Sequence, residues 1–462
     1  MRILQKNTIN LVEGPLFSGI LRYTLPIILT GTLQLLFNAA DLVVVGQFCG
    51  SISVAAVGAT GALTGLLVNL FIGLSVGAGV NVAYALGAHD DRFVHRIVHT
   101  SVPLALVCGA VLTVVGFLFS ETFLKMMETP ENVLPLSTVY MKIYFCGVTF
   151  TLLYNFAAAI LRAAGDTKSP LIFLTVAGVI NVALNVFFVT VLHMNVAGVA
   201  LATSISQAVS ALLVLLALMR RTDACRLMLS KLRFYPSHLS RIVKIGLPAG
   251  IQSSLFAISN VIIQSSINTF GDAAMSGNAA AGNIDMFLYV ALNAFHQTAQ
   301  NFIGQNLGAG QVKRIKSILW ICLASTTVLG IVMGVLTWVF GPHLLGIYIT
   351  DSAEAIAYGM IRLLYVALPY FICGIMDVCT GALRGLGEAM SPMIISVLGI
   401  CGIRLVWVYT VFQLPQFHTL ECLYISYLVS WVVTFAVQLA AFFRAWKRRC
   451  VPFLEAQPNT AV

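Results

Sequence analysis

Charge is what this sequence has least of. Only 9% of its 462 residues are charged and 59% are apolar, whereas about 25% of the residues in soluble domains are charged. Seventeen acids and twenty-six bases cannot solvate the surface of a water-soluble chain of this length. A helical bundle in lipid needs charge only at its ends. The composition therefore excludes an ordinary cytosolic protein.

The sequence also lacks the short motifs of nucleotide-driven and hydrolytic proteins. It contains no GxxxxGK[ST], HExxH or DxDxDG. Its GLSVG at residues 73–77 matches GxSxG, but it lies inside an apolar run and not at a strand-to-helix turn. The glycines near residue 75 (Gly73, Gly77 and Gly79) are expected to allow close helix contact, not to hold phosphate. The ten cysteines include no CxxC pair, so we expect them to be small packing residues. These absences predict a protein that is not an enzyme, has no catalytic residue or cofactor, and depends on an ion gradient.

Long apolar windows predict twelve membrane spans. Their centres lie near residues 32, 68, 107, 150, 182, 207, 255, 288, 328, 370, 402 and 430. Most Lys and Arg residues fall in loops on one side of these spans. The exceptions are Lys125, Lys142 and Arg362 on the other side and Arg404 inside the eleventh span. The positive-inside rule then makes both termini cytoplasmic, so the net charge of +9 indicates topology, and we expect no nucleic acid partner. Anionic lipid could still bind the long central loop.

The two halves of the chain repeat each other. LRAAGDTKSP from Leu161 matches LRGLGEAMSP from Leu383 at an offset of 222 residues, which also places Pro26 on Pro248. Each half holds six predicted spans, and an even number starts both halves on the same face. We therefore predict an all-α integral membrane protein with twelve transmembrane helices in two six-helix lobes, related by a pseudo-twofold axis along the membrane normal. The expected parts are residues 1–218 and 241–449 for the lobes, 219–240 for the cytoplasmic linker and 450–462 for the cytoplasmic tail.

Pro26 and Pro248 lie inside apolar runs. Each should bend its helix, because proline removes a backbone hydrogen bond. Matched bends in two halves would serve as gates, and a static packing kink is the alternative.

Three acids lie where lipid is expected: Asp41, Asp285 and Asp377. An ionisable group at membrane depth suggests a function, while a neutral, hydrogen-bonded packing role is the alternative. Asp41 has the most informative neighbours, at the helical spacing that gathers residues on one face and about 10 Å from the outer ends of their spans. The predicted cation-coupling residues are Gln34, Asn38, Asp41, Asn181, Asn185 and Thr203. Such a group could take up a proton or hold Na⁺ at Asp41.

The second half does not repeat this cluster, since Asp41 corresponds to Ile263 and Asn185 to Trp407. We expect its polar residues to form a charge-selective wall of a substrate cavity. His296 could titrate there or serve as a hydrogen-bonded interior group. The predicted cavity residues are Asp285, Asp377, Gln264, Asn260, Asn155 and His296.

Taken together, EGP at residue 13, LPIILTGTLQLLFNAADLVVVGQF, the paired LRAAGDTKSP and LRGLGEAMSP, and NVALN followed by GVALAT resemble the multidrug and toxic compound extrusion (MATE) family of the MOP flippase superfamily. The resemblance implies a V-shaped pair of lobes that export amphipathic, often cationic compounds in exchange for H⁺ or Na⁺. It also implies that Asp41 is the coupling acid and that Asn181, Asn185 and Thr203 complete its site. Many members have Asp where this chain has Asn185, so Asp41 is the one ionisable residue of the cluster.

We therefore expect a monomeric multidrug antiporter of a bacterial inner membrane, with small organic cations and membrane lipids as partners. Two alternatives stay open. A lipid-linked saccharide flippase of the same superfamily would need a strongly basic cavity, while Arg404 is the one base expected within the membrane. A receptor or scaffold without transport would leave the duplicated bundle and its buried acids unexplained.

Overall fold

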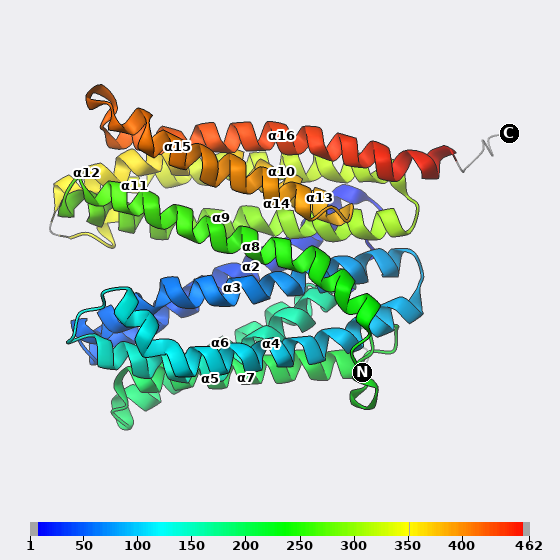
Figure 1. Ribbon diagram of the computed structural model, residues 1–462, viewed down its shortest axis with the longest axis horizontal. Coiled ribbons are helices and arrows are strands. Elements are labelled where there is room, and N and C mark those ends of the chain that lie inside the picture. Colours follow the sequence, from blue (N-terminus) through cyan, green and yellow to red (C-terminus); the bar gives the residue numbers. More distant parts are fainter. Residues whose placement is uncertain (1–7, 351, 456–462) are drawn as a thin grey trace. The chain divides into compact units, whose positions relative to one another are not determined.

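The computed structural model describes residues 8–350 and 352–455, and all regular structure in these ranges is helical (Figure 1). In chain order the helices are α2 (Leu16–Phe48), α3 (Ser51–Gly87), α4 (Asp91–Met126), α5 (Leu134–Ala163), α6 (Lys168–Val186), η1 (Phe187–Val191), α7 (Asn195–Met219), η2 (Leu229–Lys231), α8 (Pro236–Asn268), α9 (Asp272–Gly308), α10 (Val312–Val339), α11 (Gly341–Gly346), α12 (Ala353–Arg362), η3 (Leu363–Ala367), α13 (Tyr370–Gly385), α14 (Met390–Ser396), η4 (Val397–Gly402), α15 (Ile403–Tyr409), η5 (Val411–Gln413), η6 (Pro415–Phe417) and α16 (Leu420–Glu455). The predicted all-α class is confirmed.

Ten helical segments in the described ranges are long and apolar enough to cross a membrane, and a bent pair makes an eleventh. The pair consists of α12 with η3 and of α13, which meet at 40°. Pro369 stands at this break as the residue before α13, because proline lacks the N–H that would continue the helix. The remaining predicted span, near residue 288, falls in α9. This helix has 37 residues but many polar ones, most of which protein covers, as expected for polar groups at membrane depth.

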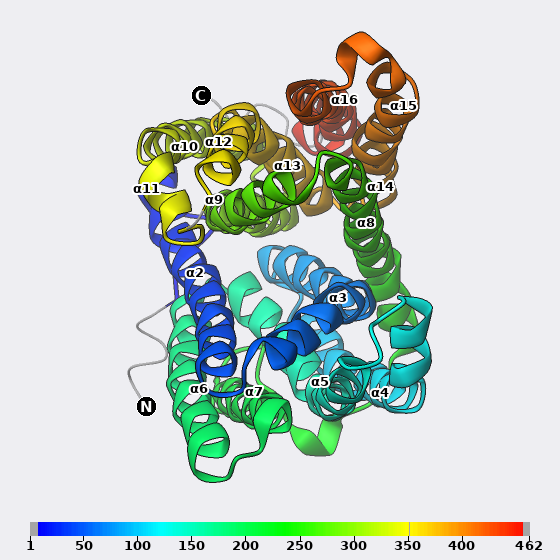
Figure 2. The ribbon, with the colours of Figure 1, turned by 90° about the vertical axis from the view of Figure 1, so that its left-hand side faces the viewer.

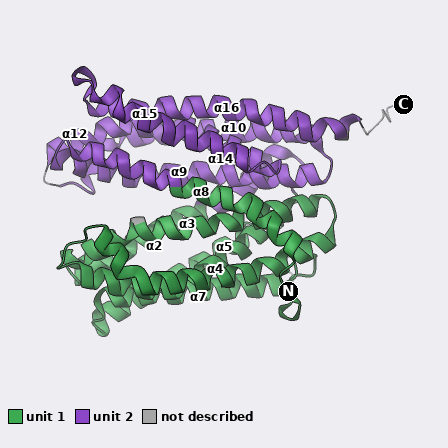
Figure 3. Ribbon diagram, in the orientation of Figure 1, with its two compact units in different colours: residues 1–10, 29–254 green, residues 11–28, 255–462 purple. Residues whose placement is uncertain are grey.

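The chain divides into two compact units (Figure 3). Unit 1 comprises residues 1–10 and 29–254, and unit 2 comprises residues 11–28 and 255–462. The predicted lobe limits lie elsewhere: residue 218 is in the last turn of α7, residue 241 is inside α8, and residue 449 is inside α16. Helices α2 and α8 each contribute one part to each unit, and the changes follow shortly after Pro26 and Pro248. The predicted lobe limits describe the two copies of the sequence repeat, and they remain a prediction.

The first part of α2 belongs to unit 2 because it packs on α9. The Tyr23 and Phe302 rings meet edge to face at 5.4 Å. Asn301 Nδ2 donates to Tyr23 Oη at 2.9 Å, and the Thr24 and Thr298 hydroxyls are 2.8 Å apart. Hydrogen bonds between buried polar groups of neighbouring helices are a common means of association in membranes.

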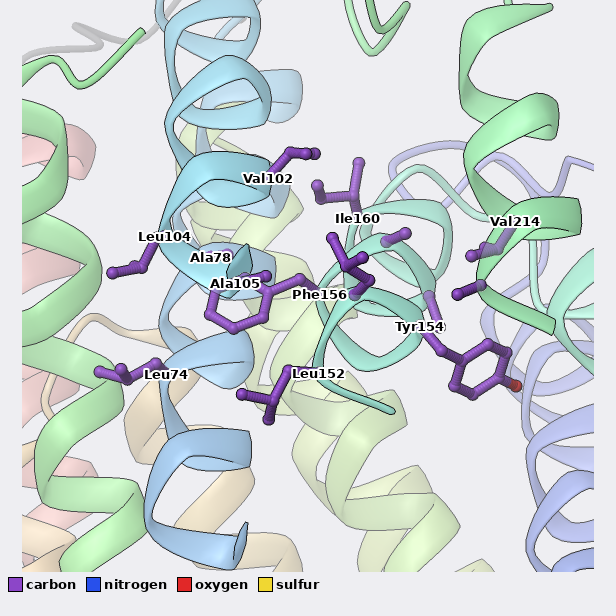
Figure 4. Close-up of a cluster of buried hydrophobic side chains, with 14 of the residues drawn as sticks. Leu74, Ala78, Val102, Leu104, Ala105, Leu152, Tyr154, Phe156, Ile160 and Val214 are labelled. Atoms are coloured by element: carbon purple, nitrogen blue, oxygen red, sulfur yellow. The ribbon is translucent and has the colours of Figure 1, made fainter. Parts of the chain in front are cut away.

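Unit 1 is built around α5, which packs against α3, α4 and α7. Figure 2 shows these helices nearly end on and side by side. The core between them consists of alternating large and small side chains. Phe156 and Leu152 of α5 meet Ala78 of α3 and Ala105 of α4 (Figure 4). Small residues let helix backbones approach closely, and dispersion contacts then stabilise the bundle.

A close helix contact in unit 1 joins α3 to the first part of α8, glycine against glycine. A Cβ atom on Gly73 would lie 2.3 Å from the Gly250 backbone nitrogen, and one on Gly77 would lie 2.1 Å from the Ile242 carbonyl oxygen. Neither neighbour is a flexible side chain. The expectation that these glycines allow close helix contact is confirmed.

Replacing Gly77 by Ala should force α3 and α8 apart. We expect the variant to lose about 1–3 kcal/mol of stability, the usual cost of overpacking, measured as a lower melting temperature in detergent. Gly58→Ala is the matched control, because Gly58 lies on the same helix and a Cβ atom added there would have nothing within 4 Å. Equal melting temperatures for both variants would contradict the packing argument.

Candidate cation site

Asp41 lies on the part of α2 that belongs to unit 1, facing α6 and α7. Asn185 Nδ2 of α6 donates a hydrogen bond to Asp41 Oδ1, and Thr203 Oγ1 of α7 lies 3.4 Å from Asp41 Oδ2. The same hydroxyl lies 3.0 Å from the Val199 carbonyl oxygen. A hydroxyl has one proton, so it donates to one of these acceptors at a time. The carboxylate is therefore only partly satisfied.

Asn181 closes the group into a ring. Asn185 Nδ2 lies 3.3 Å from Asn181 Oδ1, and Asn181 Nδ2 donates to Thr203 Oγ1 at 3.4 Å. Four side chains from three helices thus meet around one carboxylate. The structure brings together these four predicted residues, Asp41, Asn181, Asn185 and Thr203.

The ring has an unused oxygen. Asn185 is fully buried, yet its Oδ1 atom has no hydrogen-bond partner among the described residues. A buried polar atom without a partner is costly and calls for an explanation. Carboxylate, amide and hydroxyl oxygens are the ligands that a hard cation prefers. The same carboxylate can instead take up a proton, so the donor set fits either ion.

Four buried valines neighbour the ring along its helices, each about one helical turn from a ring residue. Val44 and Val45 follow Asp41, Val189 follows Asn185, and Val199 precedes Thr203; together they form one buried apolar cluster. Apolar surroundings lower the local dielectric and strengthen polar interactions. The π-helical turn η1 begins two residues after Asn185, and such turns are frequent at functional sites.

Gln34 and Asn38 were predicted as members of this group, but the structure does not bring them into the ring. Both side chains are exposed. The α2 face toward α6 carries Phe37 instead, since a Cβ on Gly178 of α6 would overlap the Phe37 ring. Gln34 lies seven residues from Asp41, about 10 Å along the helix axis.

Asp285, on α9 in unit 2, forms an ion pair that sequence reasoning missed. Arg362 Nε of α12 donates to Asp285 Oδ2 at 2.8 Å, and Arg362 Nη1 donates to Asn278 Oδ1 at 2.7 Å. Gly282, between the two α9 residues, faces the guanidinium, and a Cβ atom there would lie 3.8 Å from Arg362 Nη2, an ordinary contact. Asn278 Nδ2 in turn donates to Gln264 Oε1 at 2.8 Å. The predicted residues Asp285 and Gln264 are thus connected through two unpredicted ones.

Arg362, assigned from the sequence to the other side of the spans, lies within a continuous helical segment. It ends α12, which continues directly into η3, and only 14% of its side chain is exposed. Arg404, the base expected within the membrane, is also inside a helix, α15. Arg404 itself is buried, with its guanidinium 3.9 Å from the Tyr427 ring centre and its Nε donating to Ser430 at 3.1 Å.

Asp377 and His296 lie next to each other in unit 2. His296 Nδ1 lies 2.8 Å from the Asp377 carbonyl oxygen, and Arg384 Nη1 lies 3.4 Å from His296 Nε2. Because arginine only donates, His296 accepts at Nε2 and donates at Nδ1, as a neutral ring does. This geometry favours the hydrogen-bonded interior role for His296. The Asp377 carboxylate is hydrogen-bonded to Asn293 and also feels the charge of the Arg384 guanidinium.

The other two predicted cavity residues lie elsewhere. Asn155 belongs to α5 of unit 1, where its Nδ2 donates to the Thr151 carbonyl at 2.8 Å. Asn260 is exposed on α8. The residues that sequence reasoning missed are Arg362, Asn278 and Arg384. The sequence offered one indication of these residues: Arg362 is one of three bases on the non-cytoplasmic side of the predicted spans.

The fold and the site together define a polytopic α-helical membrane protein with a carboxylate held in a ring of neutral polar side chains. The MatE family model matches residues 26–187 and, a second time, residues 248–410. The chain therefore belongs to the MatE family. The two matches begin 222 residues apart, at Pro26 and Pro248, the offset of the sequence repeat.

Relatives and solved structures agree with this assignment. The chain is 27% identical to the "Probable multidrug resistance protein YpnP" of Bacillus subtilis (strain 168), over 85% of this chain and 87% of that protein. It is 26% identical to YoeA of the same organism, also a "Probable multidrug resistance protein", over 92% and 93%. Its fold is similar to the outward-facing structure of a multidrug resistance MATE family transporter of the MOP superfamily, with a TM-score of 0.86, 19% identity, and coverage of 97% and 99%. The predicted membrane fold is confirmed.

Proposed function

We propose that this protein is a secondary active multidrug exporter of a bacterial inner membrane. It moves amphipathic organic cations outward in exchange for H⁺ or Na⁺, works as a monomer without a cofactor, and has both termini on the cytoplasmic side. Membership of the MatE family and relatives named as multidrug resistance proteins support this role. The functional lobes are residues 1–218 and 241–449, joined by the linker 219–240 and followed by the tail 450–462.

The observation that carries the proposal is the ring around Asp41. It offers a carboxylate with a weak second hydrogen bond, a buried amide oxygen with no partner among the described residues, and a cluster of buried valines one helical turn away. A cation bound there neutralises the carboxylate. The free energy of packing the three helices around Asp41 then becomes more favourable, because a neutral group costs less to bury than a charged one. Pro26 and Pro248, inside α2 and α8, are the proposed bending points.

The energy stored in a membrane potential is sufficient to drive such an exchange. One elementary charge crossing 100 mV supplies about 2.3 kcal/mol, which corresponds to roughly fifty-fold in concentration. A proton gradient adds to this. One coupled ion therefore supports useful export of a drug.

Efflux of a cationic dye from proteoliposomes, with pH and sodium gradients imposed separately, tests the proposal. We expect one gradient to drive efflux and its collapse to stop it. Export that ignores both gradients would overturn the coupling, and failure to move any dye would favour a receptor or scaffold. The saccharide flippase has less support, because Arg362 and Arg404 are engaged by Asp285 and Tyr427 and do not form a free basic wall.

Asp377 is the better candidate for selecting cationic substrates, because Asp285 is already paired with Arg362. We expect Asp377→Asn to reduce efflux of cationic dyes about tenfold, a loss of about 1.4 kcal/mol, and to leave neutral dyes nearly unchanged. Asp272→Asn is the matched control, since Asp272 is an exposed acid of the same unit. Equal losses for cationic and neutral dyes would remove the charge-selection role.

A further inference from the structure

The segment between α7 and α8, residues 220–235, is folded back onto α4. The Leu227 backbone N–H donates to the Leu218 carbonyl at 3.1 Å and the Arg233 N–H to the His99 carbonyl at 3.3 Å. The Tyr235 N–H donates to Thr100 Oγ1 at 3.4 Å. This segment therefore has a defined position against α4.

His99 holds the middle of the segment. Its ring is fully buried and stacks on His95 with the ring centres 3.9 Å apart. Nδ1 lies 2.7 Å from the His95 carbonyl oxygen, and Nε2 accepts from the Met228 backbone N–H at 3.0 Å. Both ring nitrogens are thus used in one neutral tautomer. Cys225 and Leu227 belong to the apolar core of unit 1 and hold the start of the segment.

The contact with α4 places the segment at a definite depth. From Thr100 to the last residue of α4, Met126, the helix rises about 39 Å at 1.5 Å per residue. The hydrocarbon core is about 30 Å thick, and the bilayer with headgroups about 40–45 Å. The level of Thr100 therefore falls in the headgroup layer when the other end of α4 lies at the opposite surface.

The outward side of the segment combines apolar and basic groups. The side chain of Leu229 is 58% exposed and that of Phe234 is 40% exposed. Arg226, Lys231 and Arg233 beside them are also exposed. Asp223 is the one acid in residues 220–235, and it is paired with Arg221. The exposed face therefore presents three bases that form no ion pair with any described residue, next to two large apolar side chains.

We propose that this face, formed by Arg226, Leu229, Lys231, Arg233 and Phe234, binds the anionic surface of the membrane in which the protein is embedded. The bases contact lipid phosphates, and Leu229 and Phe234 enter the boundary between headgroups and acyl chains. Basic segments with apolar anchors bind anionic leaflets in this way. The inference does not depend on the transported substrate or on the coupling ion.

The test uses full-length protein in phosphatidylcholine nanodiscs with increasing amounts of brominated phosphatidylglycerol. The variant Phe234→Trp places a fluorescent tryptophan in the proposed contact, because bromine atoms quench tryptophan fluorescence at short range. The fluorescence of the other tryptophans, measured in the unchanged protein, is subtracted. We expect stronger quenching by brominated phosphatidylglycerol than by brominated phosphatidylcholine at equal fractions. Adding Lys231→Gln and Arg233→Gln should weaken the phosphatidylglycerol dependence about 25-fold, at about fivefold per base.

Lys125→Gln with Lys142→Gln in the same reporter background is the matched control. It removes the same charge from the opposite end of the helices and should leave quenching at residue 234 unchanged. The proposal is overturned if quenching does not distinguish the two lipids, or if the control pair weakens it as much as the test pair. Dye efflux in the same variants is expected to persist, so failure of this proposal is separable from failure of the transport proposal.

Discussion

Replacing Asp41 by Asn is expected to abolish gradient-driven efflux while leaving the protein folded. Two unit charges 4 Å apart interact by about 4 kcal/mol at an effective dielectric constant of 20, which corresponds to roughly a thousandfold in cation affinity. The amide also cannot take up a proton, so the loss is the same for either coupling ion. The measurement is dye efflux from proteoliposomes under the gradient that drives the unchanged protein.

Folding should persist because Asn has nearly the shape of Asp and keeps an oxygen for the donors of the ring. Asn38→Ala is the matched control: Asn38 lies on the same helix one turn away and is exposed, so its variant should transport normally. Undiminished gradient-driven efflux by Asp41→Asn would disprove the role of Asp41. A lower melting temperature for that variant alone would point to a packing role instead.

The second large effect concerns the buried pair of Asp285 and Arg362. Asp285→Asn leaves a nearly buried guanidinium without its counter-charge, and Arg362→Met leaves a buried carboxylate without its partner. Removing one partner of a buried pair costs about 3–5 kcal/mol, whereas replacing both can be close to neutral. We therefore expect each single variant to melt well below the unchanged protein and the double variant to recover most of the loss.

Tryptophan fluorescence during heating in detergent measures this difference. The pair Glu121 and Lys125 provides the control, because it is an exposed ion pair one turn apart on α4 and should contribute little. A double variant as unstable as the singles would show that the shape of the two side chains, and not their charge balance, stabilises α12 on α9.

This pairing changes how the acids of the second half are interpreted. Sequence reasoning treats Asp285 and Asp377 alike, as acids facing a cavity. Arg362 compensates the charge of Asp285 and connects it to Asn278 and, through it, to Gln264. Asp377 is hydrogen-bonded to the neutral Asn293 and has the Arg384 guanidinium nearby, so the two acids have different partners and are expected to respond differently to neutralisation.

The sequence by itself determined the class, the spans and the centre of the site. Apolar runs indicate which segments span the membrane, because few charged side chains are tolerated in lipid. The offset of 222 residues reports the duplication, which the double match of the family model repeats. Asp41, Asn185 and Thr203 could be placed at one level because depth in each span follows from residue number in a regular helix, and Asn181 lies one turn from Asn185.

Only the tertiary structure decided which neighbours cover each helix face. Periodicity places Gln34 and Asp41 on one side of α2, yet Phe37 takes the contact with α6 and Gln34 remains exposed. Asp285 and Arg362 are 77 residues apart, and no local pattern joins them. The polar helix α9 and the segment docked on His99 are likewise stabilised by partners distant in sequence. Hydropathy and spacing describe one helix at a time, whereas an ion pair or a docked loop depends on the packing of several.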